Sequence, residues 1–317
     1  MTTGLGTFTL RIRVPPEKAG RRLDQFLVDH LDRLSRARVQ RLLDAGGHRV
    51  SRADGTKLRA SSLLVAGEEL VVVRPRVAEP DAPLDFGVIH EDDALLVVDK
   101  PAGLPTHPAG RYYKHTLTSL LRERYGAGYA RNCHRLDRET SGLVVCAKTR
   151  DAEVIVKMQF ERREVRKTYV ALVHGAPRED AFRIDLPIVH ARSRGPLPNR
   201  VEVRDEGLPS VTDVKVLRRG ERFSLVEARP LTGRQHQIRV HLAAAGHPVV
   251  GDKLYPDARA LVDFQRDGLT PALLARLVLP RQALHAARIE LRHPTSRERV
   301  TYEAPLPGDF FDPMAAR

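Results

Sequence analysis

The first 75 residues change from an alternating to a helical spacing of hydrophobic positions. Phe8, Leu10, Ile12 and Val14 fall on one face of an extended segment, which predicts a half-buried strand. Apolar residues then recur every three or four positions, which predicts two amphipathic helices, the second capped by Ser35. The expected elements, in order, are a strand over 8–14, helices over 22–34 and 36–45, and strands over 48–52 and 70–74.

Short apolar runs separated by turn signals fill the rest of the chain and predict strands mixed with helices. A polar, arginine-rich segment over 190–204 predicts a basic loop, and 257–280 shows no regular period. There is no internal repeat. The expected strands cover 95–98, 143–147, 165–173, 211–216, 223–228, 284–291 and 300–304, and the expected helices cover 116–126, 151–164 and 232–246. Thr116 opens the first of these helices and Thr149 can cap the second. The strand over 165–173 alternates, which places Lys167 and Tyr169 on one face.

The helix over 232–246 has the most specific start signal. Thr232 and Gln235 have the spacing of a capping box, and Gly246 stops the pattern. Its expected buried residues are Ile238, Leu242 and Ala245, with Arg239 on a neighbouring flank.

Proline-rich sequence with little periodicity separates the two patterns. Residues 75–87 contain Pro75, Pro80 and Pro83, which favour a linker. A length of 317 residues also suits about two domains. We therefore expect a small domain over 1–76, a linker over 77–87 and a second domain over 88–317.

Composition points to a soluble protein of the cytoplasm. The 42% of hydrophobic residues come in runs shorter than the roughly 20 residues of a membrane helix, and the N-terminus lacks the pattern of a secretory signal. The two cysteines, Cys133 and Cys146, are too few for a disulfide scaffold and lack zinc-site spacing. We expect buried or incidental thiols.

The net charge of +13 suggests a polyanionic partner, and nucleic acid is the first candidate. A generally basic proteome would give the same balance, so the placement of the charges matters more. Arg36, Arg38 and Arg41 would line the outer face of the helix over 36–45. That face is either an RNA-binding surface or an ordinary solvated helix face.

The stretch from His134 to Gly142 holds the candidate chemistry. Asp137 lies between Arg135 and Arg138, at a loop before a β-rich run. Nearby cations favour the ionised carboxylate, which can act as a nucleophile. A surface turn could carry the same charges without any catalytic role.

The N-terminal pattern resembles the S-four-like RNA-binding domain first seen in a small-subunit ribosomal protein. The Ser-Arg start of the second helix and the sequence Val-Ala-Gly-Glu-Glu over 65–69 carry the resemblance. Residues 47–55 depart from it, because the module usually has a Val-Asn-Gly hairpin there. The resemblance implies that 1–76 binds RNA.

The motifs after residue 94 resemble those of the RluA-type pseudouridine synthases. The segment 134–142 matches the family's His-Arg-Leu-Asp-x-x-Thr-Ser-Gly motif at every fixed position. Further matches are Asp-Lys-Pro-Ala-Gly over 99–103 with His107-Pro108, Lys-Thr-Tyr over 167–169, the run over 232–241, and Leu-His-Ala over 284–286. Asp99 and Gln235 replace residues that are commoner in the family.

This resemblance implies an α+β fold with a mixed, largely antiparallel sheet, and isomerisation of uridine to pseudouridine without a cofactor. It makes Asp137 the catalytic aspartate, Tyr169 the aromatic that contacts the uracil, and Arg239 the partner of Asp137. It makes Arg135 the residue that fills the space of the flipped nucleotide and Leu284 a wall of the pocket. It implies large-subunit (23S) ribosomal RNA or its precursor particles as the partner of a monomeric enzyme.

Several alternatives stay open at this stage. The carboxylate could attack C1′ or uracil C6, or could remove a ribose proton to give a glycal. The chain could act on transfer RNA, or could be a non-catalytic ribosome-assembly factor on the same fold. A glycosidase would need a second, opposed carboxylate, for which Glu139 is the nearest acid. The spacing of His236, His241 and His247 does not suit a metal site on one helical face.

Overall fold

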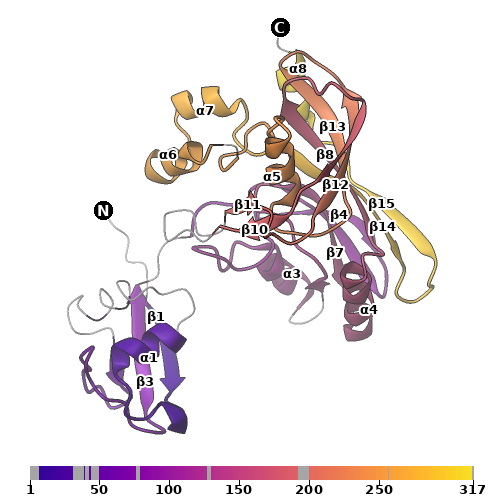
Figure 1. Cartoon of the computed structure of the whole chain (residues 1–317). Helices are drawn as coiled ribbons and strands as arrows, with labels where there is room; N and C mark the ends of the chain where they lie inside the picture. Colours follow the sequence, from indigo (N-terminus) through magenta and orange to yellow (C-terminus); the bar gives the residue numbers. More distant parts are fainter. Residues whose placement is uncertain are drawn as a thin grey trace. The chain divides into compact units, whose positions relative to one another are not determined.

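The computed structural model describes residues 7–30, 39, 43, 50–75, 79–126, 130–191, 200–255 and 257–315 (Figure 1). The chain divides into two compact units, Met1–Ala78 and Glu79–Arg317. No helix within the described ranges combines the length and apolar character that crossing a membrane requires.

The first unit is a three-stranded antiparallel sheet with one described helix. The sheet has the order β1-β3-β2, and helix α1 contributes Leu23, Phe26 and Leu27 to a core shared with Leu70 and Val72. Its elements are β1 (Thr7–Arg13), η1 (Pro16–Lys18), α1 (Leu23–His30), β2 (Val50–Arg52) and β3 (Glu69–Pro75). These agree with the three strands and the first helix that the hydrophobic pattern predicts.

Most of the predicted helix over 36–45 lies outside the described residues. Arg36, Arg38 and Arg41 are among the positions that are not described, so their role stays a prediction. Val39 and Leu43 are described as helical, and Val39 is buried in the core of this unit.

The second unit is organised around a ten-stranded mixed sheet. Its order is β4-β5-β7-β14-β8-β13-β12-β9, with β15 on β14 and β6 on β7. Among the described strands only β7 and β14 pair in parallel, which confirms the predicted largely antiparallel α+β fold. The strands are β4 (Gly87–Glu91), β5 (Leu95–Lys100), β6 (Arg131–Asn132), β7 (Ser141–Ala147), β8 (Arg166–His174), β9 (Ala181–Asp185), β12 (Val211–Arg218), β13 (Phe223–Pro230), β14 (Leu284–Arg292) and β15 (Arg299–Glu303).

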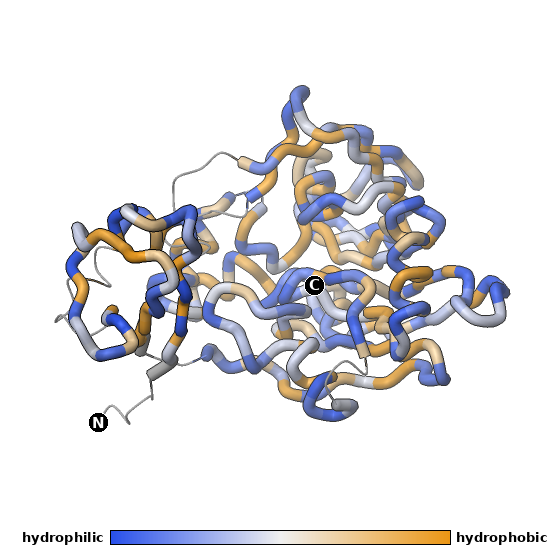
Figure 2. Tube along the Cα trace, turned by 90° about the horizontal axis from the view of Figure 1, so that it is seen from below, coloured by the Kyte–Doolittle hydropathy of each residue, from blue (hydrophilic) through white to orange (hydrophobic). Residues whose placement is uncertain are grey.

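Helices cover both faces of β7, which is buried along its whole length. Leu143 and Val145 pack with α4, whereas Val144 and Cys146 pack with α3. The hydrophobic stretches in Figure 2 accordingly follow the strands, and hydrophilic stretches mark the protruding loops. The remaining elements of this unit are α3 (Leu117–Tyr125), α4 (Arg150–Glu161), α5 (Gln237–Ala244), α6 (Arg259–Asp267), α7 (Pro271–Leu277), η2 (Gly308–Phe310) and α8 (Asp312–Ala315).

Helices α3 and α4 begin where their threonine caps predict. The Thr116 side chain accepts from the Ser119 N–H, and the Thr149 side chain accepts from the Ala152 N–H. Each bond satisfies one of the free N–H groups at a helix start, so a local signal sufficed.

Two sequence predictions for this unit are wrong. The segment 190–204 is not a loop at its two ends, because they belong to the antiparallel strands β10 (Ile188–His190) and β11 (Val201–Val203), while residues 192–199 lie outside the described residues. Val201 is buried, and its N–H donates to the Tyr255 hydroxyl at 3.1 Å, a partner far along the chain. The segment 257–280 forms α6 and α7, two short helices that bury Ala260, Leu273 and Leu277 mainly against each other.

Residues from 79 onwards pack on the second unit, although the predicted linker extends to residue 87. Glu79 accepts from the backbone N–H groups of Tyr113 and Lys114, the latter at 2.6 Å. Phe86 is buried beside α3, and β4 begins at Gly87. The strands β4, β6 and β9 were not predicted, because each of them has at most one buried residue and shows no period.

Candidate active site

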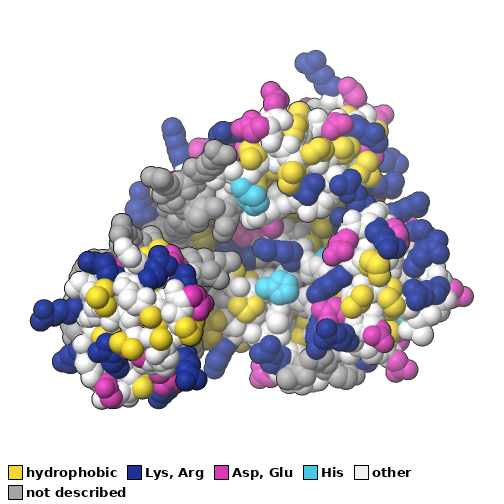
Figure 3. All heavy atoms as spheres, turned by 60° about the horizontal axis from the view of Figure 1, so that its bottom comes forward, with side chains coloured by type: hydrophobic (Ala, Val, Ile, Leu, Met, Phe, Trp, Pro, Cys, Tyr) yellow, Lys and Arg dark blue, Asp and Glu magenta, His cyan; other side chains and the backbone are white. Residues whose placement is uncertain are grey.

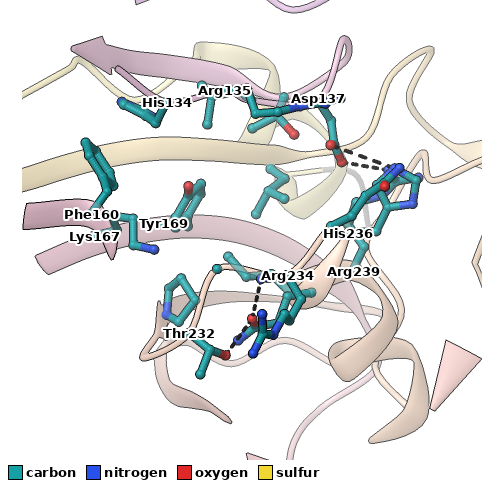
Figure 4. Close-up of a pocket in the computed structure, with 18 residues that line it drawn as sticks. His134, Arg135, Asp137, Phe160, Lys167, Tyr169, Thr232, Arg234, His236 and Arg239 are labelled. Atoms are coloured by element: carbon teal, nitrogen blue, oxygen red, sulfur yellow. Dashed lines mark hydrogen bonds and ion pairs between the residues drawn. The ribbon is translucent and has the colours of Figure 1, made fainter. Parts of the chain in front are cut away.

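A cavity of about 420 Å³ lies beside the loop that carries Asp137 (Figure 4). Residues from β8, β13, β14, α4, α5 and two loops line it. The face of the second unit in Figure 3 is hollowed and carries Lys, Arg and His side chains in and around the hollow. The cavity brings together all the residues that the resemblance selects in this unit: Arg135, Asp137, Tyr169, Arg239 and Leu284.

Buried hydrogen bonds from Thr106 and Lys100 hold the backbone of the loop that carries Asp137. The Thr106 hydroxyl donates to the Leu136 carbonyl at 2.9 Å and accepts from the Leu136 N–H at 3.1 Å. The fully buried Lys100 ammonium donates to the carbonyls of Leu104 and Arg138, at 2.8 and 3.2 Å. These bonds fix the backbone on both sides of Asp137, so its carboxylate has a defined position.

Gly142 in the same motif allows a close approach of two strands. Its φ is +105°, and an added Cβ would lie 2.3 Å from the Ala286 carbonyl oxygen. Any side chain would therefore push apart β7 and β14, the parallel pair that joins the Asp137 loop to the pocket wall. The glycine of the motif is required by packing.

Asp137 is partly exposed to the cavity and paired with Arg239. The Arg239 Nη1 donates to Asp137 Oδ2 at 2.8 Å, and the Asp137 side chain is 23% exposed. Burial alone would raise the pKa of Asp137, but the charges of His236, Arg239 and Arg135 and the bond from Arg239 lower it below the usual value. The carboxylate is therefore ionised at neutral pH.

His236 contributes little of that positive charge at neutral pH. Its Nε2 lies 3.8 Å from Asp137 Oδ1, and burial lowers its pKa to about 4 despite the attraction of Asp137. The imidazole is thus neutral above that pH, and Arg239 is the cation that holds Asp137.

Asp252 binds the side of Arg239 that does not face Asp137, and this residue was not selected from the sequence. Its carboxylate is fully buried and accepts from Nε and Nη2 of Arg239, at 2.7 and 2.8 Å. Its Oδ1 also accepts from the N–H groups of Leu254 and Tyr255. Asp252 therefore aims the third guanidinium nitrogen at Asp137. In the sequence, Asp252 is a single acidic residue after Gly251, and nothing near it indicates that it binds Arg239.

The start of α5 differs from the predicted capping box. The helix begins at Gln237, and the residue before it, His236, has a left-handed φ of 53°. Gln237, not Gln235, reaches back: its Oε1 accepts from the Thr232 hydroxyl at 2.7 Å and from the Arg234 N–H at 3.0 Å. The helix ends at Ala244, so Ala245 lies beyond it and is exposed, whereas Ile238 and Leu242 are buried as predicted.

Tyr169 and Leu284 form apolar walls near Asp137. Tyr169 projects from β8, between β13 and β14, and burial together with the charge of Asp137 raises the pKa of its phenol. The phenol thus keeps its proton at neutral pH. Leu284 is only 4% exposed, and Arg135 at the rim is exposed and has no ion pair among the described residues.

The cavity lacks the second carboxylate that a glycosidase needs. Asp137 is the only acid among the described residues that line it. Glu139 turns to other partners and accepts from Arg138 and from the Lys253 ammonium, both at 2.8 Å. The geometry therefore disfavours the hydrolase alternative.

The three histidines near α5 have separate partners. His241 contacts the Thr212 hydroxyl and the Leu186 carbonyl, His247 contacts the His174 carbonyl, and His236 faces Tyr255. Within the described ranges no cluster of three or more His, Cys, Asp or Glu side chains could hold a metal ion. Cys133 and Cys146 are buried, and burial raises the pKa of each thiol.

Comparisons with known proteins agree with this geometry. The sequence model of a family described as RNA pseudouridylate synthase matches residues 94–244. The ribosomal large subunit pseudouridine synthase D of Xanthomonas campestris pv. campestris is 37% identical over 314 residues, which are 96% of this chain and 91% of that protein. The protein of the same name from Nitrosomonas europaea is 34% identical and covers 95% of this chain and 86% of its own length.

A solved structure shares the fold as well. The structure of human RNA pseudouridylate synthase domain containing 1 matches with a TM-score of 0.57 and 31% identity, over 72% of this chain and 86% of that chain.

Proposed function

The chain belongs to the RNA pseudouridylate synthase family and is an RNA pseudouridine synthase, and from this premise we propose that its substrate is large-subunit (23S) ribosomal RNA. The names of the relatives from Xanthomonas campestris and Nitrosomonas europaea support this target. The cavity around Asp137, with one ionised carboxylate and several cations, supports the chemistry.

Asp137 is the proposed catalytic residue. The reaction breaks the bond from uracil N1 to ribose C1′, turns the uracil in the pocket and joins C5 to C1′. The C5 proton is lost and N1 gains one, so no redox partner is required. An ionised carboxylate can start this sequence by attack on C1′ or C6, or by removal of a ribose proton.

The other pocket residues receive distinct roles in this proposal. Tyr169 keeps a neutral phenol ring against the uracil, and Leu284 closes the apolar wall. Arg239 orients Asp137, and Arg135 at the rim occupies the space that the extruded nucleotide leaves. A flipped uridine costs a few kcal/mol of unstacking, which stacking and phosphate contacts offset.

The N-terminal unit is proposed to bind the RNA outside the pocket, as an S-four-like domain. Its support is the basic sequence pattern of Arg36, Arg38 and Arg41, in a unit whose described residues form a small sheet and a helix. Replacing all three by Gln should weaken RNA binding and lower its salt dependence, since fewer phosphates are neutralised. Filter binding at several salt concentrations measures both, and an unchanged salt dependence would remove this role.

We also propose that the enzyme acts as a monomer in the cytoplasm, on ribosomal RNA or its precursor particles and without a cofactor. Analytical ultracentrifugation of the purified protein tests the first of these. Comparing naked RNA with partly assembled particles as substrates tests which of the two the enzyme modifies.

Tritium release from RNA labelled at uracil C5 tests the function directly, because forming the C5–C1′ bond expels that hydrogen. The wild type should release tritium from unmodified large-subunit ribosomal RNA, and Asp137→Asn should release none while still binding the RNA. Equal release by both would remove Asp137 from the chemistry. Release only from transfer RNA would change the target, and binding without release from any RNA would indicate an assembly factor.

A further inference from the structure

Lys167 is a partly buried cation in the active-site cavity that the roles above leave unused. Its side chain projects into the cavity from β8, two residues before Tyr169 (Figure 4). No hydrogen bond or ion pair joins its ammonium to another described residue. Burial, with no compensating carboxylate, lowers the pKa of Lys167. An ammonium that is partly withdrawn from water and has no partner among the described residues is costly, which suggests that a partner arrives with the substrate.

Arg234 shows the same feature on the neighbouring wall. It lines the cavity, and its Nε is buried without a partner in the described part of the chain. Its backbone N–H is already used by Gln237 Oε1, so the loop itself is held in place. Buried polar atoms without partners are rare in folded proteins and call for an explanation such as a bound ligand.

Gly233 precedes Arg234 in the chain and lies against the Lys167 ammonium in space. A Cβ added at this glycine would lie 3.7 Å from the Lys167 Nζ, so the ammonium lies directly against the loop. Gly233 itself is exposed, and a ligand can therefore reach this corner. We call the group of Lys167, Gly233 and Arg234 the basic corner.

Charges along the cavity decide which kind of ligand fits the basic corner. The described lining carries three arginines and one lysine, Arg135, Arg234, Arg239 and Lys167, against the single acid Asp137. Arg239 already binds Asp137, and Asp252 behind it. His134 near Lys167 is neutral, because burial lowers its pKa to about 3. An anion on the substrate is therefore the complementary partner.

We propose that the basic corner binds a backbone phosphate of the RNA strand that carries the target uridine. The inference rests on the proposed function and adds a substrate contact to it. Lys167 lies on the same strand and face as Tyr169, at a spacing of roughly 7 Å along the backbone. A uracil against Tyr169 therefore places its own strand next to the ammonium, and the phosphate supplies the partner that Lys167 and Arg234 lack.

Replacing the lysine tests this contact. Lys167→Met should weaken binding of a large-subunit ribosomal RNA fragment about tenfold, as expected for one charge-assisted hydrogen bond. Its plot of log affinity against log salt should have a slope smaller by about 0.7 to 0.9, the effect of one lost phosphate contact. Lys167→Arg should keep most of the affinity and the slope. Filter binding at four salt concentrations measures these values.

Lys215 offers a matched control. It also projects from a strand, β12, but is exposed and does not line the cavity. Lys215→Met should leave affinity and slope near the wild-type values. An equal loss in both Met variants would overturn the proposal, because any lysine would then contribute through general charge. Thermal unfolding of both variants separates lost binding from lost folding, and Lys167→Arg serves as the test if Lys167→Met does not fold.

Tritium release in the same samples distinguishes the two proposals. No release by the wild type from any RNA would reject the proposed function itself. Release by the wild type, with unchanged affinity and salt slope in Lys167→Met, would reject the basic corner alone. A loss of kcat in that variant without a change in affinity would also overturn it, because Lys167 would then act on the uracil rather than on a phosphate.

Discussion

Two arginine–aspartate pairs in the second unit have the same geometry and very different surroundings. Arg239 donates two bonds to Asp252, at 2.7 and 2.8 Å, and Arg183 donates two to Asp213, at 2.7 and 3.1 Å. The side chains of the first pair are 8% and 0% exposed, and those of the second are 61% and 39% exposed.

The difference in burial gives the two pairs different consequences. At the surface, water and salt screen the charges, so the pair between β9 and β12 contributes little. Inside the protein, an arginine without its carboxylate would be an uncompensated buried charge. Only the buried pair can therefore hold the Asp137 carboxylate in place, and geometry alone would not tell the two apart.

The largest expected effect is on stability. Asp252→Asn should lower the free energy of unfolding by about 3 to 5 kcal/mol, the typical cost of breaking a buried pair from one side. Asp213→Asn should leave it nearly unchanged, because both partners reach water. Urea unfolding of the two variants measures the contrast. Similar losses in both would mean that burial does not set the strength of these pairs.

A smaller effect is expected on catalysis. Arg239→Lys keeps the charge but cannot bind Asp252 through two nitrogens and Asp137 through a third. We expect kcat for tritium release to fall about a hundredfold, which corresponds to about 2.7 kcal/mol. The matched variant Arg183→Lys should retain wild-type kcat. An active Arg239→Lys enzyme would show that positive charge alone suffices.

The effect that is smallest at any one pH step concerns Lys100, a buried cation with carbonyl partners only. Burial lowers its pKa to about 7, although the charges of Asp137 and Asp99 oppose the shift. Between about pH 7 and 10 the unfolded chain still binds the proton that the folded protein has released. The free energy of unfolding should therefore rise with pH over that interval, by at most about 1.4 kcal/mol per unit.

Urea unfolding at pH 7, 8 and 9 tests this dependence against Lys100→Met. The wild type should gain stability relative to the variant as the pH rises. Parallel curves would show that Lys100 keeps its charge in the folded protein, as Arg239 does beside its two carboxylates.

Local signals in the sequence predicted much of the fold. Alternation predicted β8, and Thr116 and Thr149 predicted the starts of α3 and α4, because each rule depends on residues within one turn or strand. The pattern missed α6 and α7, whose few buried residues pack mainly on each other. It also missed β11, whose Val201 is buried by Tyr255 from 54 positions away.

The residues of the candidate site also divide into those that the sequence identified and those whose role only the structure revealed. The sequence by itself selected Asp137, since its motif is contiguous, and it selected Tyr169, Arg239 and Leu284 through separate short motifs. Only the tertiary structure brought Arg239 to Asp137 across 102 positions, placed Asp252 behind it, and left the Arg234 Nε buried without a partner in the described part of the chain. Ionisation and charge pairing depend on distance and on the exclusion of water, and both arise only when the chain has folded.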